Sequence, residues 1–76
     1  MKRLNDVRLG EEATLITVEA NENIKKRLLD IGMVKGSKIT PVLISPGKDM
    51  VAYNIKGAVI AIRKDDTRNI IVEDQA

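Results

Sequence analysis

The sequence predicts a small, mainly β fold: a five-stranded barrel with one short α-helix inserted between the first and second strands. Three observations support this fold class. Residues 21–31 repeat apolar side chains at helical spacing, and no other stretch does so over a comparable length. Five short runs rich in Ile, Val and Thr are separated by turn residues. So few short strands bury their apolar residues best by curling into a barrel, which also removes most free edges.

Length and composition restrict the class of protein further. The 76 residues are enough for one domain, residues 1–76, with a single small core. Tyr53 is the only aromatic residue, so this core must be aliphatic. The absence of Cys and His excludes disulfides and thiolate metal sites and removes the commonest general base. No apolar run approaches the roughly 20 residues of a membrane span, and residues 1–10 lack a signal-peptide segment, so we expect a cytoplasmic protein.

The chain opens with a short lead-in followed by the first strand. We expect Leu4 and Leu9 to enter the core and the backbone to turn at Gly10. Residues 13–19 are largely β-branched and contain no strand breaker, so they form the first strand. Regular alternation along it predicts two faces, one with Ile16 and Val18 and the other with Leu15 and Thr17.

The helix follows over residues 21–31. Asn21 and Asn23 are both suitable N-caps, because an Asn side chain accepts from the first free backbone N–H groups. Its apolar face is made by Ile24, Leu28 and Ile31, which seal the barrel. Gly32 ends the helix as the C′ residue, so that Met33 folds back on the helix.

Four more strands follow the helix. They are residues 38–45, 49–55, 58–63 and 69–73. Pro41 cannot donate to a neighbouring strand, so its strand is an edge there, or carries a bulge or bend. Residues 64–68 form a polar turn or a single helical turn capped by Asp65. Four glycines are expected at structural turns: Gly32, Gly36, Gly47 and Gly57.

Surface charge is concentrated on the helix and the turn after it. The net charge of the chain is only +2, but residues 21–40 carry five basic and two acidic side chains. We predict a partner-binding surface made of Lys25, Lys26, Arg27, Val34, Lys35 and Met50. The alternatives are a solvated helix face for the lysines and an ion pair with Asp30 for Arg27.

A family resemblance rests on motifs along most of the chain. These are the Leu4…Gly10 opening, Arg27-Leu28, Ile31-Gly32 with Gly36 after three residues, the Pro46-Gly47 hairpin, the Gly57 turn with AVIAIR, and the closing NIIVE. With them the chain resembles the FeoA family, the small cytosolic component of bacterial ferrous iron transport. The resemblance implies an SH3-like barrel and a regulatory role toward FeoB, a membrane permease with a cytosolic GTP-binding domain. Pro41 departs from the family pattern, which has an aliphatic residue there.

The residues themselves predict a protein that is not an enzyme. No nucleophile–base pair exists without His or Cys, and the carboxylates lie in turns. We expect no cofactor, no small-molecule substrate and no metal site. The carboxylates of Asp65-Asp66 with Glu73-Asp74 could bind a cation weakly, but their places in an exposed turn and at the chain end account for these acidic residues without a metal. By analogy with the family that the chain resembles, the leading hypothesis is a protein-interaction module that binds the cytosolic part of a FeoB-like permease.

A second hypothesis belongs to another class. The chain could be a small barrel that binds nucleic acid, or an isolated version of the SH3-like domain of metal-dependent repressors. The near absence of aromatic residues weighs against single-strand binding, which uses stacked side chains. An exposed strand edge near Pro41 would permit self-association, although no residue requires it.

Overall fold

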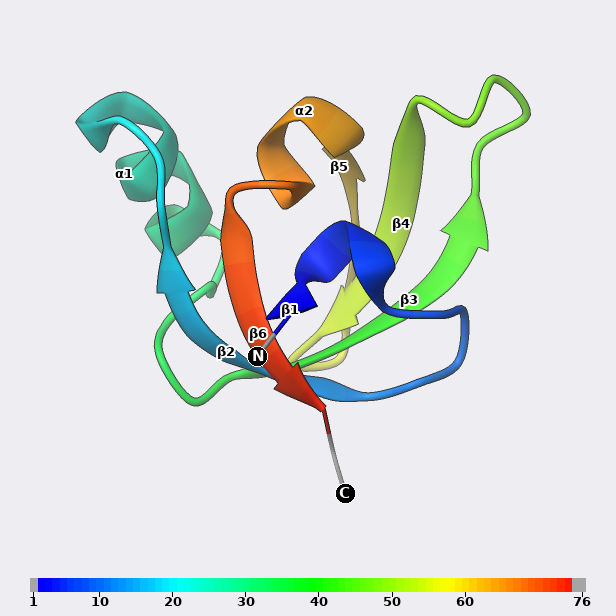
Figure 1. Cartoon of the computed structure of the whole chain (residues 1–76), viewed down its shortest axis with the longest axis horizontal. Coiled ribbons are helices and arrows are strands. Elements are labelled where there is room, and N and C mark those ends of the chain that lie inside the picture. Colours follow the sequence, from blue (N-terminus) through cyan, green and yellow to red (C-terminus); the bar gives the residue numbers. More distant parts are fainter. Residues whose placement is uncertain (1, 75–76) are drawn as a thin grey trace.

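The computed structural model of this chain describes residues 2–74. Its strands form one antiparallel sheet of six strands. The strands are β1 (Lys2–Arg3), β2 (Ala13–Val18), β3 (Lys38–Ile44), β4 (Met50–Ile55), β5 (Ala58–Arg63) and β6 (Ile70–Asp74). The helices are η1 (Leu4–Asp6), α1 (Glu22–Asp30) and α2 (Lys64–Thr67). Figure 1 shows the sheet curving strongly, with α1 on the side opposite to the β3–β4 hairpin.

The sheet is curved but not closed, and it has six strands where five were predicted. The strand order is β1-β6-β2-β3-β4-β5, which leaves β1 and β5 as outer strands that do not pair with each other. The additional strand is β1, whose two residues pair with Val72 and Ile71 of β6. A pairing of two residues is too short to produce an alternating sequence pattern. The mainly β fold class itself is confirmed.

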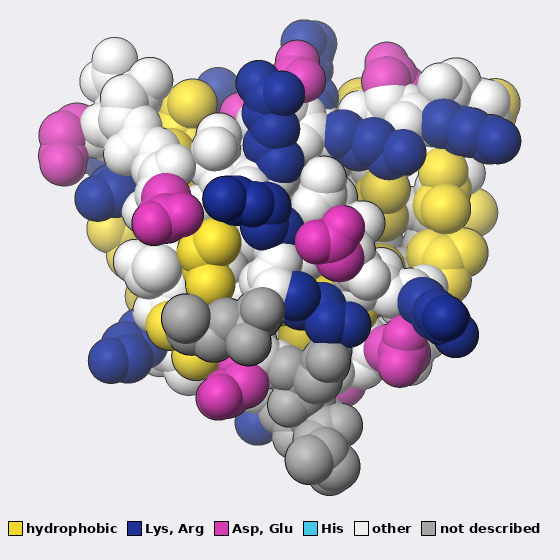
Figure 2. All heavy atoms as spheres, viewed as in Figure 1, with side chains coloured by type: hydrophobic (Ala, Val, Ile, Leu, Met, Phe, Trp, Pro, Cys, Tyr) yellow, Lys and Arg dark blue, Asp and Glu magenta, His cyan; other side chains and the backbone are white. Residues whose placement is uncertain are grey.

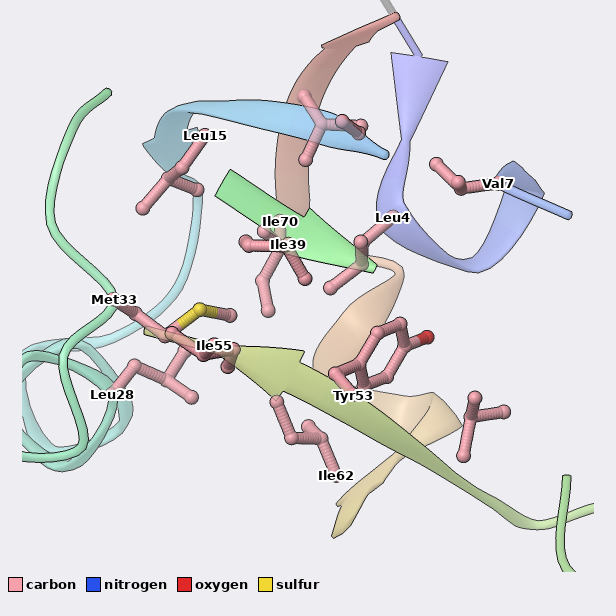
Figure 3. Close-up of a cluster of buried hydrophobic side chains, with 13 residues drawn as sticks. Leu4, Val7, Leu15, Leu28, Met33, Ile39, Tyr53, Ile55, Ile62 and Ile70 are labelled. Atoms are coloured by element: carbon pink, nitrogen blue, oxygen red, sulfur yellow. The ribbon is translucent and has the colours of Figure 1, made fainter. Parts of the chain in front are cut away.

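The core is aliphatic around one tyrosine, as composition required (Figure 3). Its buried members are Leu4, Val7, Ala13, Leu15, Leu28, Met33, Ile39, Val51, Tyr53, Ile55, Ile62, Ile70 and Val72. Leu4 is fully buried, as expected, but Leu9 is 49% exposed. Val7 takes the core position instead, because the 3-10 turn η1 brings it round to the core.

A bulge in β2 overturns the predicted alternation of that strand. The register against β6 shifts between Leu15 and Thr17, so Ile16 is an extra residue without a direct partner. Past the bulge the two faces exchange, since side chains alternate with a period of two. Leu15 and Val18 therefore both pack on the core, while Thr17 is exposed.

Two of the alternatives predicted for Pro41, a bulge and a free edge, are both found near it in β3. The register between β3 and β4 shifts between Pro41 and Leu43, which is a bulge. On the other side, β2 pairs only with Lys38 and Ile39, so β3 is a free edge beyond them. The Pro41 carbonyl accepts a hydrogen bond of 2.8 Å from the Gly10 N–H. A proline fits here because no strand requires its missing N–H.

Helix α1 begins and ends as its sequence predicts. Of the two candidate caps, Asn21 is the one used: its side chain accepts from the Ile24 N–H at 3.0 Å. At the other end Gly32 has a φ of 97°. The N–H of Gly32 donates to the Leu29 carbonyl at 3.0 Å, and the N–H of Met33 to the Leu28 carbonyl at 2.9 Å. These two bonds define a Schellman motif.

The four glycines expected at turns all lie in turns. Gly32, Gly36 and Gly57 have positive φ, whereas in the Pro46–Gly47 hairpin the positive φ of 60° belongs to Lys48. Gly47 therefore occupies the predicted turn without the left-handed conformation. The predicted Asp65 cap was wrong, because the N-cap residue of α2 is Arg63, which makes no side-chain cap hydrogen bond.

Candidate partner-binding site

A groove of about 580 Å³ runs between helix α1 and the β5–α2 segment. Its lining residues are Ile24, Arg27, Leu28 and Ile31 from α1 and its C-cap, Met50 from β4, and Ile60, Ala61, Ile62, Arg63, Asp65 and Asp66 from β5 and α2. The groove exists because α1 rests on the core mainly through Leu28, its one buried residue. Ile24 and Ile31 pack against the core only partly, so the helix does not close onto β5.

The floor of the groove is apolar and its rim is charged. Leu28 and Ile62 are buried, while Ile24, Ile31 and Ile60 are partly exposed and available for contact. At the rim are two arginines and two aspartates: Arg27, Arg63, Asp65 and Asp66. Within residues 2–74 none of these four side chains forms an ion pair. A groove of this kind fits a peptide segment with apolar and charged residues better than a polar metabolite.

The predicted partner-binding residues are divided between two surfaces. Arg27 and Met50 line the groove. Lys25 and Lys35 instead border a shallower hollow of about 190 Å³, where Leu29 is 55% exposed. Lys26 and Val34 are exposed but line neither hollow. The structure thus separates the basic helix face from the apolar groove.

The ion pair considered between Arg27 and Asp30 is not formed within residues 2–74. In this part of the chain Arg3 forms an ion pair with Glu19, with an N···O distance of 3.8 Å. Both of its side chains are more than half exposed, so its contribution to stability is small. The guanidinium of Arg27 is accordingly open to an external carboxylate.

Sequence reasoning missed the β5 side of the groove. Ile60, Ile62 and Arg63 were predicted to be strand residues, and Asp66 a turn residue, without a binding role. The segment AVIAIR did carry a signal, because five consecutive apolar residues are unusual in a strand with one solvated face. Only the three-dimensional arrangement places this segment opposite α1.

A second exposed apolar surface follows β3. Val42, Leu43 and Ile44 are 44%, 64% and 42% exposed. Figure 2 shows apolar side chains gathered at the right of the molecule, while acidic and basic side chains are interspersed over the rest of that face. A hollow of about 260 Å³ next to this surface reaches Tyr53. Burial raises the pKa of the Tyr53 phenol, and a hydrogen bond with Thr67 opposes the rise in part.

Residues 2–74 contain no group of three or more carboxylates that could hold a metal ion. None of the helices in this part of the chain is both long and apolar enough to cross a membrane.

Comparison with known proteins supports one family. Residues 2–74 match the family model described as the FeoA domain. Over 71 residues the chain is 35% identical to the Fe(2+) transport protein A/Fe(2+) transporter FeoB fusion protein of Porphyromonas gingivalis. This alignment covers 93% of the chain but only 8% of the fusion protein.

Two solved structures show the same fold. The solution structure of the FeoA protein from Chlorobium tepidum superposes with a TM-score of 0.91 at 27% identity, covering 97% of this chain and 70% of that one. The crystal structure of Stenotrophomonas maltophilia FeoA, described as an SH3 domain protein, gives a TM-score of 0.82 at 23% identity. That match covers 96% of this chain and 91% of the other, and it shows that the fold is SH3-like.

Proposed function

Because this chain belongs to the FeoA family of ferrous iron transport, we propose that it is a non-enzymatic module that binds a FeoB-type permease and regulates iron uptake. The observation that carries the proposal is the groove between α1 and β5. It offers an apolar floor and unpaired rim charges, which are the properties of a protein-docking surface. We place this action in the cytoplasm, on the cytosolic part of the permease.

The fusion relative supports this choice of partner. Its name joins a transport protein A to a FeoB transporter in one polypeptide. Fusion keeps two binding modules at high local concentration, so affinity between them can be low. The groove is the surface that we propose for this contact, and the Lys25–Lys35 hollow is a second region that the same partner can reach.

The proposal is tested by measuring binding to the purified cytosolic part of the FeoB-type permease from the same organism. Ala61→Lys adds a long charged side chain at an exposed position of β5 that borders the groove, so the core is not disturbed. We expect it to weaken binding roughly tenfold or more, as substitutions at central interface positions do. The matched control is Leu43→Lys, an equally exposed change on β3 outside the groove, which should bind like wild type.

Other outcomes of this experiment are informative. Loss of binding in Lys25→Glu/Lys35→Glu, with Ala61→Lys unaffected, would move the docking surface to the basic hollow. If wild type does not bind the permease at all, the proposed function is wrong. Binding to duplex DNA that weakens steeply with salt would favour the nucleic-acid alternative.

A further inference from the structure

Strand β5 is an outer strand with a regular, unprotected edge. It pairs with β4 over six consecutive residue pairs without a bulge, and among the described residues no strand pairs with its other side. Natural sheets usually protect such an edge with a proline, a bulge or a lysine. Residues 58–62 of β5 have none of these devices, a charged side chain coming only at Arg63 where the strand ends, and Val59 near its start is 65% exposed.

The hairpin before β5 determines which backbone groups lie on this edge. Lys56 and Gly57 both have positive φ, 52° and 85°, which identifies a two-residue type I′ turn. In such a hairpin the pair that flanks the turn, here Ile55 and Ala58, exchanges hydrogen bonds, and bonded and non-bonded pairs alternate from there. The backbone groups of Ile60 and Ile62 therefore face β4.

The N–H and C=O groups of Val59 and Ala61 consequently point away from the sheet. Outside the strand pairings, no backbone hydrogen bond within residues 2–74 involves either residue. Two donors and two acceptors, spaced as on a strand, are thus open to an incoming chain. Ala61 is also a lining residue of the groove, so this edge runs along the groove itself.

Helix α1 forms the opposite wall of the groove through Ile24, Leu28 and Ile31. An edge strand facing a helix across an apolar groove is the arrangement in which extended peptides bind by strand addition. Main-chain hydrogen bonds to the edge supply affinity, and alternate side chains fill the groove and supply specificity. At about 580 Å³, the groove is large enough for several side chains of one extended segment but not for a second folded layer.

We infer that an extended segment of the protein partner adds to β5 as a further strand, lying in the groove between β5 and α1. This inference rests on the function proposed above and adds the mode of recognition. The lining of the groove predicts the composition of this segment. Alternate apolar side chains should contact Ile60 and Ile62. By charge complementarity, an acidic residue should pair with Arg27 or Arg63, and a basic residue with Asp65 or Asp66.

Amide hydrogen exchange measured by NMR tests the inference residue by residue. In the free protein the amides of Val59 and Ala61 should exchange rapidly, whereas those of Ile60 and Ile62 are protected by β4. Addition of the cytosolic part of the permease should slow exchange at Val59 and Ala61 at least tenfold. Unchanged exchange at both residues in the saturated complex would overturn strand addition.

A proline substitution tests the same point by affinity. Ala61→Pro removes an edge N–H that β4 does not use, so the sheet should be retained. We expect binding to weaken roughly tenfold, while Ala61→Val, which keeps the N–H, should bind within about threefold of wild type. Ile44→Pro is the matched control at the free edge of β3, because Ile44 lies opposite Val51 and its N–H also points away from β4.

The results separate the two proposals. If wild type binds the permease and Ala61→Pro binds equally well, the proposed function stands and strand addition is overturned. If neither binds, the proposed function itself fails. If the amides of Val59 and Ala61 become protected with rising protein concentration alone, the occupant of the edge is a second copy of this chain, which also overturns the inference.

Discussion

At the scale of single residues, Tyr53 combines a structural role with a measurable signal. Its ring is almost fully buried, and its hydroxyl is hydrogen-bonded to Thr67, a fully buried side chain of α2. Thr67 also donates to the Lys64 carbonyl at 3.2 Å. The two residues thus connect β4 to the short helix that borders the groove. Burial disfavours the charged phenolate, so it raises the pKa of the phenol above its ordinary value.

This raised pKa predicts a loss of stability in alkali. The folded state keeps the Tyr53 proton at a pH where the unfolded chain releases it, so the free energy of unfolding should decrease as pH rises above about 10. Tyr53→Phe removes this dependence and costs roughly 1 kcal/mol at neutral pH through the lost hydrogen bond. Urea unfolding of both proteins between pH 7 and pH 11 measures the effect. The difference in the free energy of unfolding between wild type and Tyr53→Phe should shrink above about pH 10. An equal pH dependence of the two proteins would contradict the argument.

At the scale of elements, α1 shows why local signals can be read from sequence. Its N-cap, its apolar spacing and its glycine stop all depend on residues within one turn of the element. The part that sequence did not resolve was the choice between Asn21 and Asn23. Both are residues that favour the cap position, but Asn21 is the one that has the extended backbone of a cap residue, with ψ near 165°, while Asn23 lies inside the helix.

We therefore expect the two asparagines to respond differently to substitution. Asn21→Ala removes the acceptor of the Ile24 N–H and should lower the free energy of unfolding by about 1 kcal/mol. Asn23→Ala is the control, since Asn23 is exposed within the first turn and makes no cap bond; it should be neutral or slightly stabilising. Urea denaturation followed by circular dichroism measures both. Equal destabilisation by the two changes would mean that the cap is not specific to Asn21.

Features that depend on distant pairing could not be predicted in the same way. The bulge at Ile16 is set by the register of β2 against β6, which lies more than fifty residues away in the chain. Likewise, Arg63 and Asp66 become part of a binding surface only because the sheet curvature brings β5 opposite α1. The fold class and its turns were therefore predictable. The groove was not predicted, although two of its lining residues, Arg27 and Met50, were among the predicted partner-binding residues.

At the scale of the whole molecule, the open sheet depends on its lead-in segment. β1 pairs with β6 at one edge, and Arg3 donates to the Arg68 carbonyl. The fully buried Leu4 then enters the core near Tyr53 (Figure 3). The first residues are thus an integral part of the core. A chain of this length has only roughly 4–11 kcal/mol of total stability, so the loss of one such residue is serious.

The last prediction follows from that small margin. Leu4→Ala should lower the free energy of unfolding by about 2–5 kcal/mol, because it removes buried methyl groups and leaves a cavity in a core with few other residues. Leu9→Ala makes the same chemical change at the residue that is 49% exposed, and should cost no more than about 0.5 kcal/mol. Equilibrium unfolding in urea at neutral pH compares the two. A similar loss for both would show that Leu9, too, is buried in solution, whereas a small loss for Leu4→Ala would show that the lead-in is not part of the cooperative core.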